Sequence, residues 1–143
     1  KLGLYSELAR KHIVEARNHI ASKKLQSNEN NIRLFRETVF SGKIPAISSI
    51  TESDDFYTLS SCRDLCFHEQ EHRFTIEEIQ KTLKSNELKF LGFILRQESK
   101  SLYKKYFPED EQQTNLLKWS MFEEKHPHTF RGMYQFWVSK KKI

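Results

Sequence analysis

The run of apolar residues at positions 88–95, LKFLGFIL, constrains the fold of this chain more than any other segment. A strand this uniformly apolar is typical of a sheet that is covered on both faces. Residues 132–139, GMYQFWVS, form a second strand pattern, which is richer in aromatic residues. Residues 1–5 form the end of a short apolar strand. Buried strands need further layers packed against them. The sequence therefore predicts an α/β protein with three strands and helices between them.

Helical patterns fill the segments between the predicted strands, so the chain is mostly helical by content. Ser6 fits the N-cap of a helix, and Thr75 with Glu78 fits a capping box. The predicted helices and helical turns span 7–24, 31–40, 54–59, 60–67, 76–86, 99–106 and 110–124.

No internal repeat or low-complexity linker interrupts the chain, which predicts a single unit over residues 1–143. This unit would consist of a strand at 1–5, a helical stretch over 6–87, and a strand pair with intervening helices over 88–143.

The four glycines stand alone at positions 3, 42, 92 and 132, so neither a dinucleotide-binding G-x-G-x-x-G loop nor a P-loop can form. The net charge of +5 is moderate, and the basic end at 140–142 is read as a solubilising tail, which disfavours nucleic acid as a partner. No apolar run reaches the roughly 18–20 residues of a membrane span. Cys62 and Cys66 are expected to be reduced and packed, as in a cytoplasmic protein.

The chain begins at Lys1, and no signal peptide follows. We therefore expect it to be a piece of a longer polypeptide.

Residues 68–72 spell H-E-x-x-H, the pattern in which two histidines of a zinc protease bind the metal and the glutamate activates a water. That chemistry needs a helix of several turns and a third ligand. Thr75 caps the next helix only three residues after His72, and no H-x-x-G-x-x-H extension follows. The sequence therefore predicts no metal site here, and a hydrolase or other metal protein that uses His68 and His72 is the weaker hypothesis.

The segment around this pattern is dense in charged and titratable side chains. Histidine can act as an acid or a base near neutral pH, so the segment could form the wall of a functional site. A structural network that fixes the connection between two helices explains the same residues equally well. Both interpretations stay open for Arg63, Asp64, His68, Glu71, His72 and Arg73.

Four phrases of the sequence carry a family resemblance: KLGLYSELAR at the start, FYTLSSCRDLCFHEQEHRFTIEEI in the middle, LKFLGF, and FEEKHPHTFRGMYQFWVSKK at the end. Together they resemble the C-terminal part of a bacterial group of class I S-adenosylmethionine-dependent methyltransferases. Members of this group often carry tetratricopeptide repeats before the methyltransferase domain. The resemblance spans nearly the whole chain, in order.

The resemblance implies a Rossmann-like, doubly wound sheet of which this chain holds the last three strands, so the domain would be incomplete. LGLYS would be the fifth strand, LKFLGFIL the sixth, and GMYQFWVS the seventh, antiparallel to its neighbours. Residues 6–87 would be a large helical insertion that covers the substrate. The cofactor-binding loop would lie before Lys1, so this chain would bind no S-adenosylmethionine by itself and would not be active alone, whereas the full-length protein would bind it.

Matching positions of the family phrases are expected to line the substrate side of the site. His68 and His72 are the candidate catalytic bases, because methyl transfer needs mainly positioning and sometimes a base. The positions that match the family phrases and are expected on the substrate side are Tyr5, Arg63, Asp64, His68, Gln70, Glu71, His72 and Arg73.

The upstream part of the same polypeptide would be the main partner. Without the fourth strand, residues 2–5 would form an open sheet edge, which predicts a homodimer through that edge. A non-catalytic helical interaction module is the alternative function.

Overall fold

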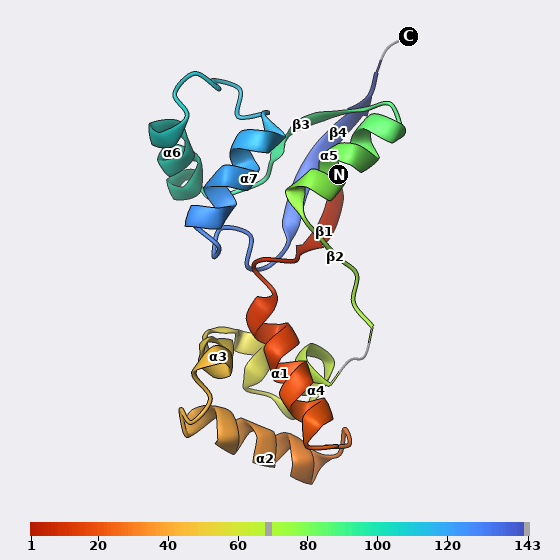
Figure 1. Cartoon of the computed structure of the whole chain (residues 1–143), viewed down its shortest axis with the longest axis vertical. Helices are drawn as coiled ribbons and strands as arrows, with labels where there is room; N and C mark the ends of the chain where they lie inside the picture. Colours follow the sequence, from red (N-terminus) through yellow and green to blue (C-terminus); the bar gives the residue numbers. More distant parts are fainter. Residues whose placement is uncertain (68–69, 142–143) are drawn as a thin grey trace. The chain divides into compact units, whose positions relative to one another are not determined.

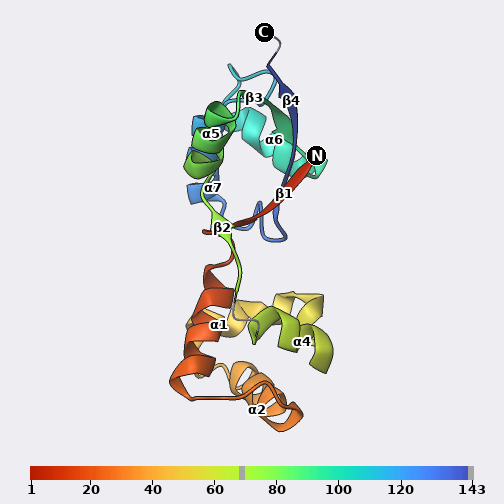
Figure 2. The same cartoon turned by 90° about the vertical axis from the view of Figure 1, so that its right-hand side faces the viewer.

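The computed structural model describes residues 1–67 and 70–141 of the chain (Figure 1). It is an α/β structure that divides into two compact units, residues 1–10 with 72–143 and residues 11–71. The first unit contains the sheet and the second is helical (Figures 1 and 2). Each unit is described by itself below.

The sheet has four strands in the order β2-β1-β4-β3, which are β1 (Leu2–Ser6), β2 (Arg73–Phe74), β3 (Leu88–Phe93) and β4 (Tyr134–Lys140). β4 runs antiparallel to both β1 and β3. β2 is parallel to β1 and pairs with its last two residues, Tyr5 and Ser6. The sequence predicts a connector where β2 lies. The three-strand prediction was therefore one short strand too few.

The pairing with β2 also changes the expected open edge. It covers β1 at Tyr5 and Ser6, and the backbone N–H of Glu7 continues the pairing by donating to the carbonyl of Phe74 at 2.9 Å. Leu2, at the start of the strand, is 40% exposed. A homodimer through the remaining edge stays a prediction.

Strand β3 contains a bulge at Gly92. The register against β4 shifts between Phe90 and Gly92, and Gly92 adopts a φ of +133°, which residues with a side chain rarely adopt. The extra residue turns both Phe90 and Phe93 to the same, buried face. Leu91 on the opposite face is 47% exposed. The prediction of a strand covered on both faces was therefore wrong, because β3 buries one face only.

Helices α5 (Ile76–Ser85) and α7 (Leu116–Lys125) pack against each other, and both views place them on one side of the sheet (Figures 1 and 2). α6 (Gln97–Tyr106) packs on α7. The core between these elements is aromatic: the rings of Tyr103 and Trp119 stack at 3.7 Å between centroids.

Helix α7 begins later than its apolar pattern predicts. Asp110, expected to lie in the helix, instead accepts hydrogen bonds from the Tyr103 hydroxyl at 2.6 Å and from the backbone N–H of Asn115 at 3.0 Å. Asn115 is the N-cap, and its side chain accepts from the N–H of Lys118 at 3.2 Å. The helix starts at Leu116 because these bonds hold the preceding residues in a loop.

The capping box predicted at the start of α5 is confirmed. The Thr75 hydroxyl accepts from the N–H of Glu78 at 3.2 Å, and the Glu78 carboxylate accepts from the N–H of Thr75 at 2.8 Å. Two N–H groups without an intrahelical partner are thereby satisfied.

Replacing Thr75 by Ala is expected to lower the free energy of unfolding by about 1 kcal/mol, because one of these N–H groups loses its acceptor. Urea denaturation monitored by circular dichroism measures the change. Thr82→Ala, at an exposed position of the same helix, is the matched control and should change stability by less than about 0.5 kcal/mol. Equal losses in the two variants would contradict the role of the cap.

The helical unit has a hydrophobic core of its own, built around Phe35 and Phe56. Its first helix starts later than predicted: the Ser6 hydroxyl accepts from the N–H of Ala9, as an N-cap would, but residues 7–10 form turns. Cys62 and Cys66 are both buried thiols. The elements are α1 (Lys11–Ser22), α2 (Glu29–Phe40), α3 (Pro45–Ser48), two 3₁₀ turns (Ser49–Glu52 and Asp54–Phe56) and α4 (Leu59–Cys66).

Among the described residues, no helix combines the length and the apolar character that crossing a membrane requires.

Candidate functional site

The residues expected to form a site wall belong to both compact units. Tyr5, His72 and Arg73 lie in the unit with the sheet, whereas Arg63, Asp64, Gln70 and Glu71 lie in the helical unit. His68 falls outside the described residues, as does Glu69 of the H-E-x-x-H pattern. A shared cleft for the whole set stays a prediction.

Tyr5 and Arg73 form a surface cluster at the end of β1. They are paired residues of the parallel β1–β2 ladder. The Nε of Arg73 donates to the carboxylate of Glu7 at 3.1 Å, and the guanidinium of Arg10 lies 4.4 Å from the centre of the Tyr5 ring. An ion pair and a cation–π contact therefore fix both candidates at the sheet edge.

Glu71 is part of a structural clamp. It forms an ion pair with Arg17 at 3.0 Å, and its side chain is only 5% exposed. The same guanidinium donates to the backbone carbonyl of Leu65 at 2.8 Å. Arg17 thus ties α1 to the end of α4 and to the segment that follows. For Glu71 these contacts favour the structural-network interpretation.

The other described candidates of the wall are exposed. Arg63 and Asp64 lie on the solvent side of α4, and Gln70 and His72 are exposed in the connection to β2. Residues 70–72 are not helical. No group of three or more His, Cys, Asp or Glu side chains in the described part of the chain is arranged to hold a metal ion.

A buried carboxylate that the sequence analysis did not single out lies at the carboxyl end of β1. Glu123 on α7 is 4% exposed and accepts hydrogen bonds from the hydroxyls of Ser6 and Tyr134, the latter at 2.6 Å. Ser6 and Tyr134 are themselves fully buried. The three residues join the end of β1, the start of β4 and helix α7.

Burial raises the pKa of Glu123 above its ordinary value of 4.5, against the opposing effect of the two hydroxyl donors. Burial also raises the pKa of Tyr134, and the neighbouring Glu123 carboxylate adds to that shift. Tyr134 therefore stays a hydrogen-bond donor at every physiological pH. The arrangement can hold a carboxyl group whose proton is retained to a higher pH than in solution.

A second carboxylate links α5 to α7. The Ser120 hydroxyl donates to Glu77, and this hydrogen bond is the main reason why the pKa of Glu77 is lowered. Glu77 also contributes to raising the pKa of Glu123.

The carboxyl ends of β1 and β3 lie at one edge of the sheet, together with the start of β4. The register shows this directly, because Leu4 pairs with Tyr134 and Phe93 pairs with Phe136. Open α/β sheets bind ligands outside the carboxyl ends of their parallel strands. This edge is therefore the first place to look for a ligand site.

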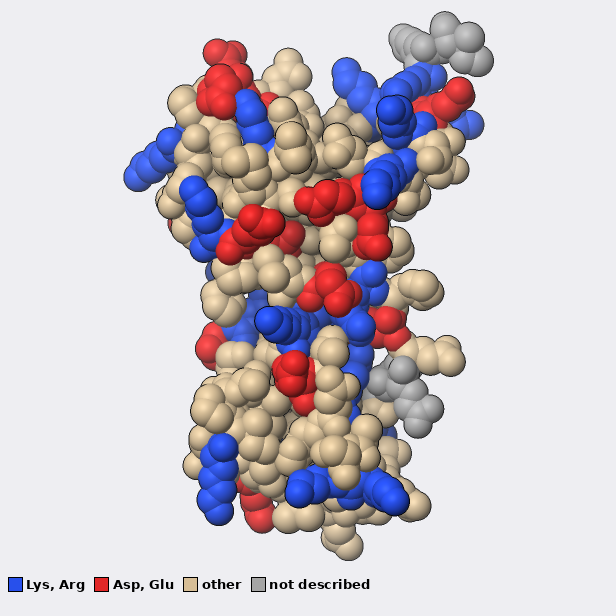
Figure 3. Space-filling model, viewed as in Figure 1, with Lys and Arg blue, Asp and Glu red and all other residues tan. Residues whose placement is uncertain are grey.

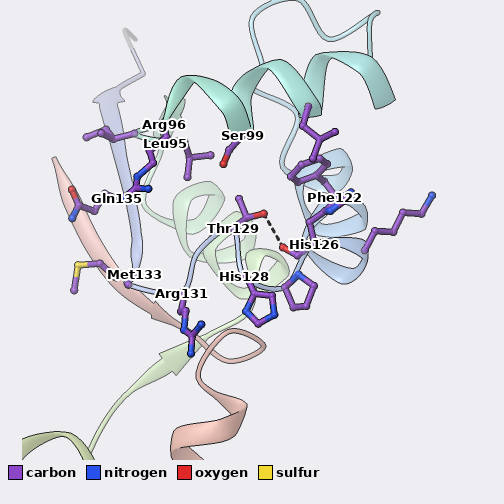
Figure 4. Close-up of a pocket in the computed structure, with 15 residues that line it drawn as sticks. Leu95, Arg96, Ser99, Phe122, His126, His128, Thr129, Arg131, Met133 and Gln135 are labelled. Carbon is purple, nitrogen blue, oxygen red and sulfur yellow. Dashed lines mark hydrogen bonds between the residues drawn. The ribbon is translucent and has the colours of Figure 1, made fainter. Parts of the chain in front are cut away.

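A cavity of about 870 Å³ opens at this edge (Figure 4). Its lining comes from residues 94–102 after β3, from the end of α7, and from the loop before β4. That volume is in the range of small-molecule sites. The Thr129 hydroxyl donates to the carbonyl of His126 at 2.7 Å and holds the loop that closes the lower side in Figure 4.

Charges of both signs are spread over the face shown in Figure 3. Basic and acidic side chains alternate among the residues drawn in colour, so this face has no broad field of one sign.

No family model matches this chain, and none of the curated proteins matches it either.

Proposed function

We propose that this chain is the C-terminal, acceptor-side part of an S-adenosylmethionine-dependent methyltransferase. The observation that supports the proposal best is the position of β4. The last strand of the chain lies between β1 and β3 and runs antiparallel to both. The resemblance implies a seventh strand that is antiparallel to its neighbours.

The position of the cavity supports the same function. It lies outside the carboxyl ends of β1 and β3, where the methyl acceptor would have to meet a cofactor held by the upstream strands. The chain contributes no Gly-rich turn after a strand, so no residue here is assigned to the cofactor. Its own residues would bind and orient the acceptor and exclude water.

A proton acceptor is needed only where the methyl acceptor loses a proton. His68 and His72 keep this role in the proposal. His72 is exposed and packs its ring 6.1 Å from that of Phe74 on β2. Exposure leaves the imidazole accessible to a substrate, and a histidine side chain can accept a proton from one. The His72→Gln variant of the full-length enzyme tests this assignment by its pH–rate profile.

Residues 1–143 alone are expected not to bind S-adenosylmethionine, whereas the protein encoded by the full open reading frame should bind it. The physical reason is that the Gly-rich loop that accommodates the cofactor is absent from this chain. Isothermal titration of both proteins gives the comparison. Low-micromolar binding to residues 1–143, or no binding to the full-length protein, would contradict the proposal.

A helical interaction module is the second candidate. The observation in its favour is the self-contained core of residues 11–71, together with the exposed apolar side chains of Leu34, Phe40 and Tyr57. Pull-down of a partner by full-length protein that binds no S-adenosylmethionine, with the binding lost in Phe40→Ser, would favour this function over methyl transfer.

A further inference from the structure

The cavity at the carboxyl ends of β1 and β3 is lined by charged side chains of one sign only. None of the 15 described residues that line it is an aspartate or glutamate. Three of them, Arg96, Lys125 and Arg131, are permanently positive near neutral pH, and His126 and His128 add two imidazoles. A concave site lined by one sign of charge concentrates ligands of the opposite sign.

The positive groups reach the cavity from three separate segments. Arg96 precedes α6, Lys125 ends α7, and Arg131 lies in the loop before β4. In Figure 4 the side chains of His128 and Arg131 project from that loop at the lower edge of the cavity. Charges that converge from separate elements are brought together by the fold and not by a local run of basic residues.

Arg96 is available for this role because of its position. It is the N-cap residue of α6, but its side chain makes no capping hydrogen bond, and the residue is exposed. A guanidinium can bind a carboxylate or a phosphate through two parallel hydrogen bonds. Its replacement should therefore remove a ligand contact without removing a helix cap.

The inner surface of the cavity is apolar and aromatic. Leu95, Leu102 and Phe122 line it, and Phe122 is fully buried in the core. The Phe122 ring packs against the His126 imidazole at 4.7 Å, which fixes the histidine at the wall. Ser99 supplies a hydroxyl from α6 on the facing side (Figure 4).

We propose that this cavity binds a small organic anion, with its carboxylate or phosphate group at Arg96 and Arg131 and its apolar part against Leu95 and Leu102. The prediction that an anion binds follows from the cavity and its lining and does not depend on the proposed function. That this anion is the methyl acceptor rests on the proposed function. The chemical class of the acceptor would then be an acid or a phosphate ester with an apolar or aromatic body.

Titration of ¹⁵N-labelled residues 1–143 with matched probes tests the proposal. Phenylacetate and phenylacetamide have nearly the same shape and differ in charge. Phenyl phosphate carries a phosphate group in place of the carboxylate. We expect either anion to shift the backbone amide signals of Ser99, Thr129 and Arg131, and to bind about tenfold more tightly than phenylacetamide, because charge-assisted hydrogen bonds are the stronger ones. Preference for phenylacetate or for phenyl phosphate identifies the anionic group.

Single substitutions identify which positive side chains bind the anion. Arg96→Gln and Arg131→Gln should each weaken anion binding about tenfold and leave the weaker binding of phenylacetamide unchanged. Lys104→Gln removes an equal charge from an exposed position of α6 outside the cavity and should have no effect.

Equal affinity for the anions and phenylacetamide, or signal changes confined to residues outside the cavity, would overturn the inference. These outcomes concern the probes alone, so they are distinct from the failure of the full-length protein to bind S-adenosylmethionine, which would refute the proposed function instead.

Discussion

Replacing Phe93 by Ala is expected to lower the free energy of unfolding of the sheet unit by about 3–5 kcal/mol. Phe93 is 5% exposed, and its ring contacts those of Trp119, Phe130 and Phe136, with centroids 4.6–5.8 Å apart. Removing it leaves a cavity at the centre of the aromatic core, between strand, helix and loop. The surrounding rings are held by one another and cannot collapse into the space.

Leu91→Ala is the matched control for this substitution. It lies two residues away on the same strand, but on the opposite face, where it is 47% exposed. We expect a change of less than about 0.5 kcal/mol. Urea unfolding followed by tryptophan fluorescence compares the two variants. Similar losses at both positions would mean that β3 buries both of its faces, as its sequence alone predicts.

The contrast between these two residues shows what a sequence pattern could and could not predict. The run LKFLGFIL predicts a strand, and the strand is present at Leu88–Phe93. Its apolar uniformity does not reveal the bulge at Gly92, which puts Phe90 and Phe93 on one face. The conformation of Gly92 depends on pairing with β4, more than 40 residues later, and is not encoded locally.

Local signals were more successful at helix starts. The capping box of Thr75 and Glu78 needs only residues that are three apart, and it forms as predicted. The start of α7 depends instead on Asp110, whose partner Tyr103 lies on α6. β2 is two residues long and exists because β1 lies beside it. Both features come from tertiary contacts, which override local propensity.

The buried site was missed because a carboxylate in an amphipathic helix is normally read as solvent-exposed. A signal was present nonetheless. Leu116, Trp119, Ser120 and Glu123 follow the i, i+3, i+4, i+7 spacing of one buried helix face, so Glu123 occupies an apolar position. A charged residue at such a position needs buried donors. Those donors, Ser6 and Tyr134, are distant in sequence and could not be assigned without the fold.

The Glu123 group gives the sheet unit a defined dependence on pH. Because burial raises the pKa of Glu123, the folded protein holds this proton more tightly than the unfolded chain does. The resulting stabilisation is complete below the ordinary pKa of 4.5 and is lost as the pH rises through the higher pKa of the folded state. The hydroxyls of Ser6 and Tyr134 limit this loss, since they donate to the ionised form.

Replacing Tyr134 by Phe is therefore expected to have an effect that grows with pH. At pH 8 the ionised carboxylate loses one of its two hydroxyl donors in a buried site, which should cost about 1.5–3 kcal/mol. At pH 4.5 Glu123 is protonated in the folded state, and the cost should be smaller. Urea unfolding of the wild type and the variant at several pH values between 4.5 and 8 measures the difference.

Tyr106→Phe removes a hydroxyl from a side chain that is 43% exposed and serves as the control. Its effect should stay within about 0.5 kcal/mol at every pH. If the cost of Tyr134→Phe were the same at pH 4.5 and pH 8, Glu123 would not change its protonation over this range, and Tyr134 would contribute through packing alone. A cost that increases between these values assigns the pH dependence to the Glu123 carboxylate, which joins β1, β4 and α7.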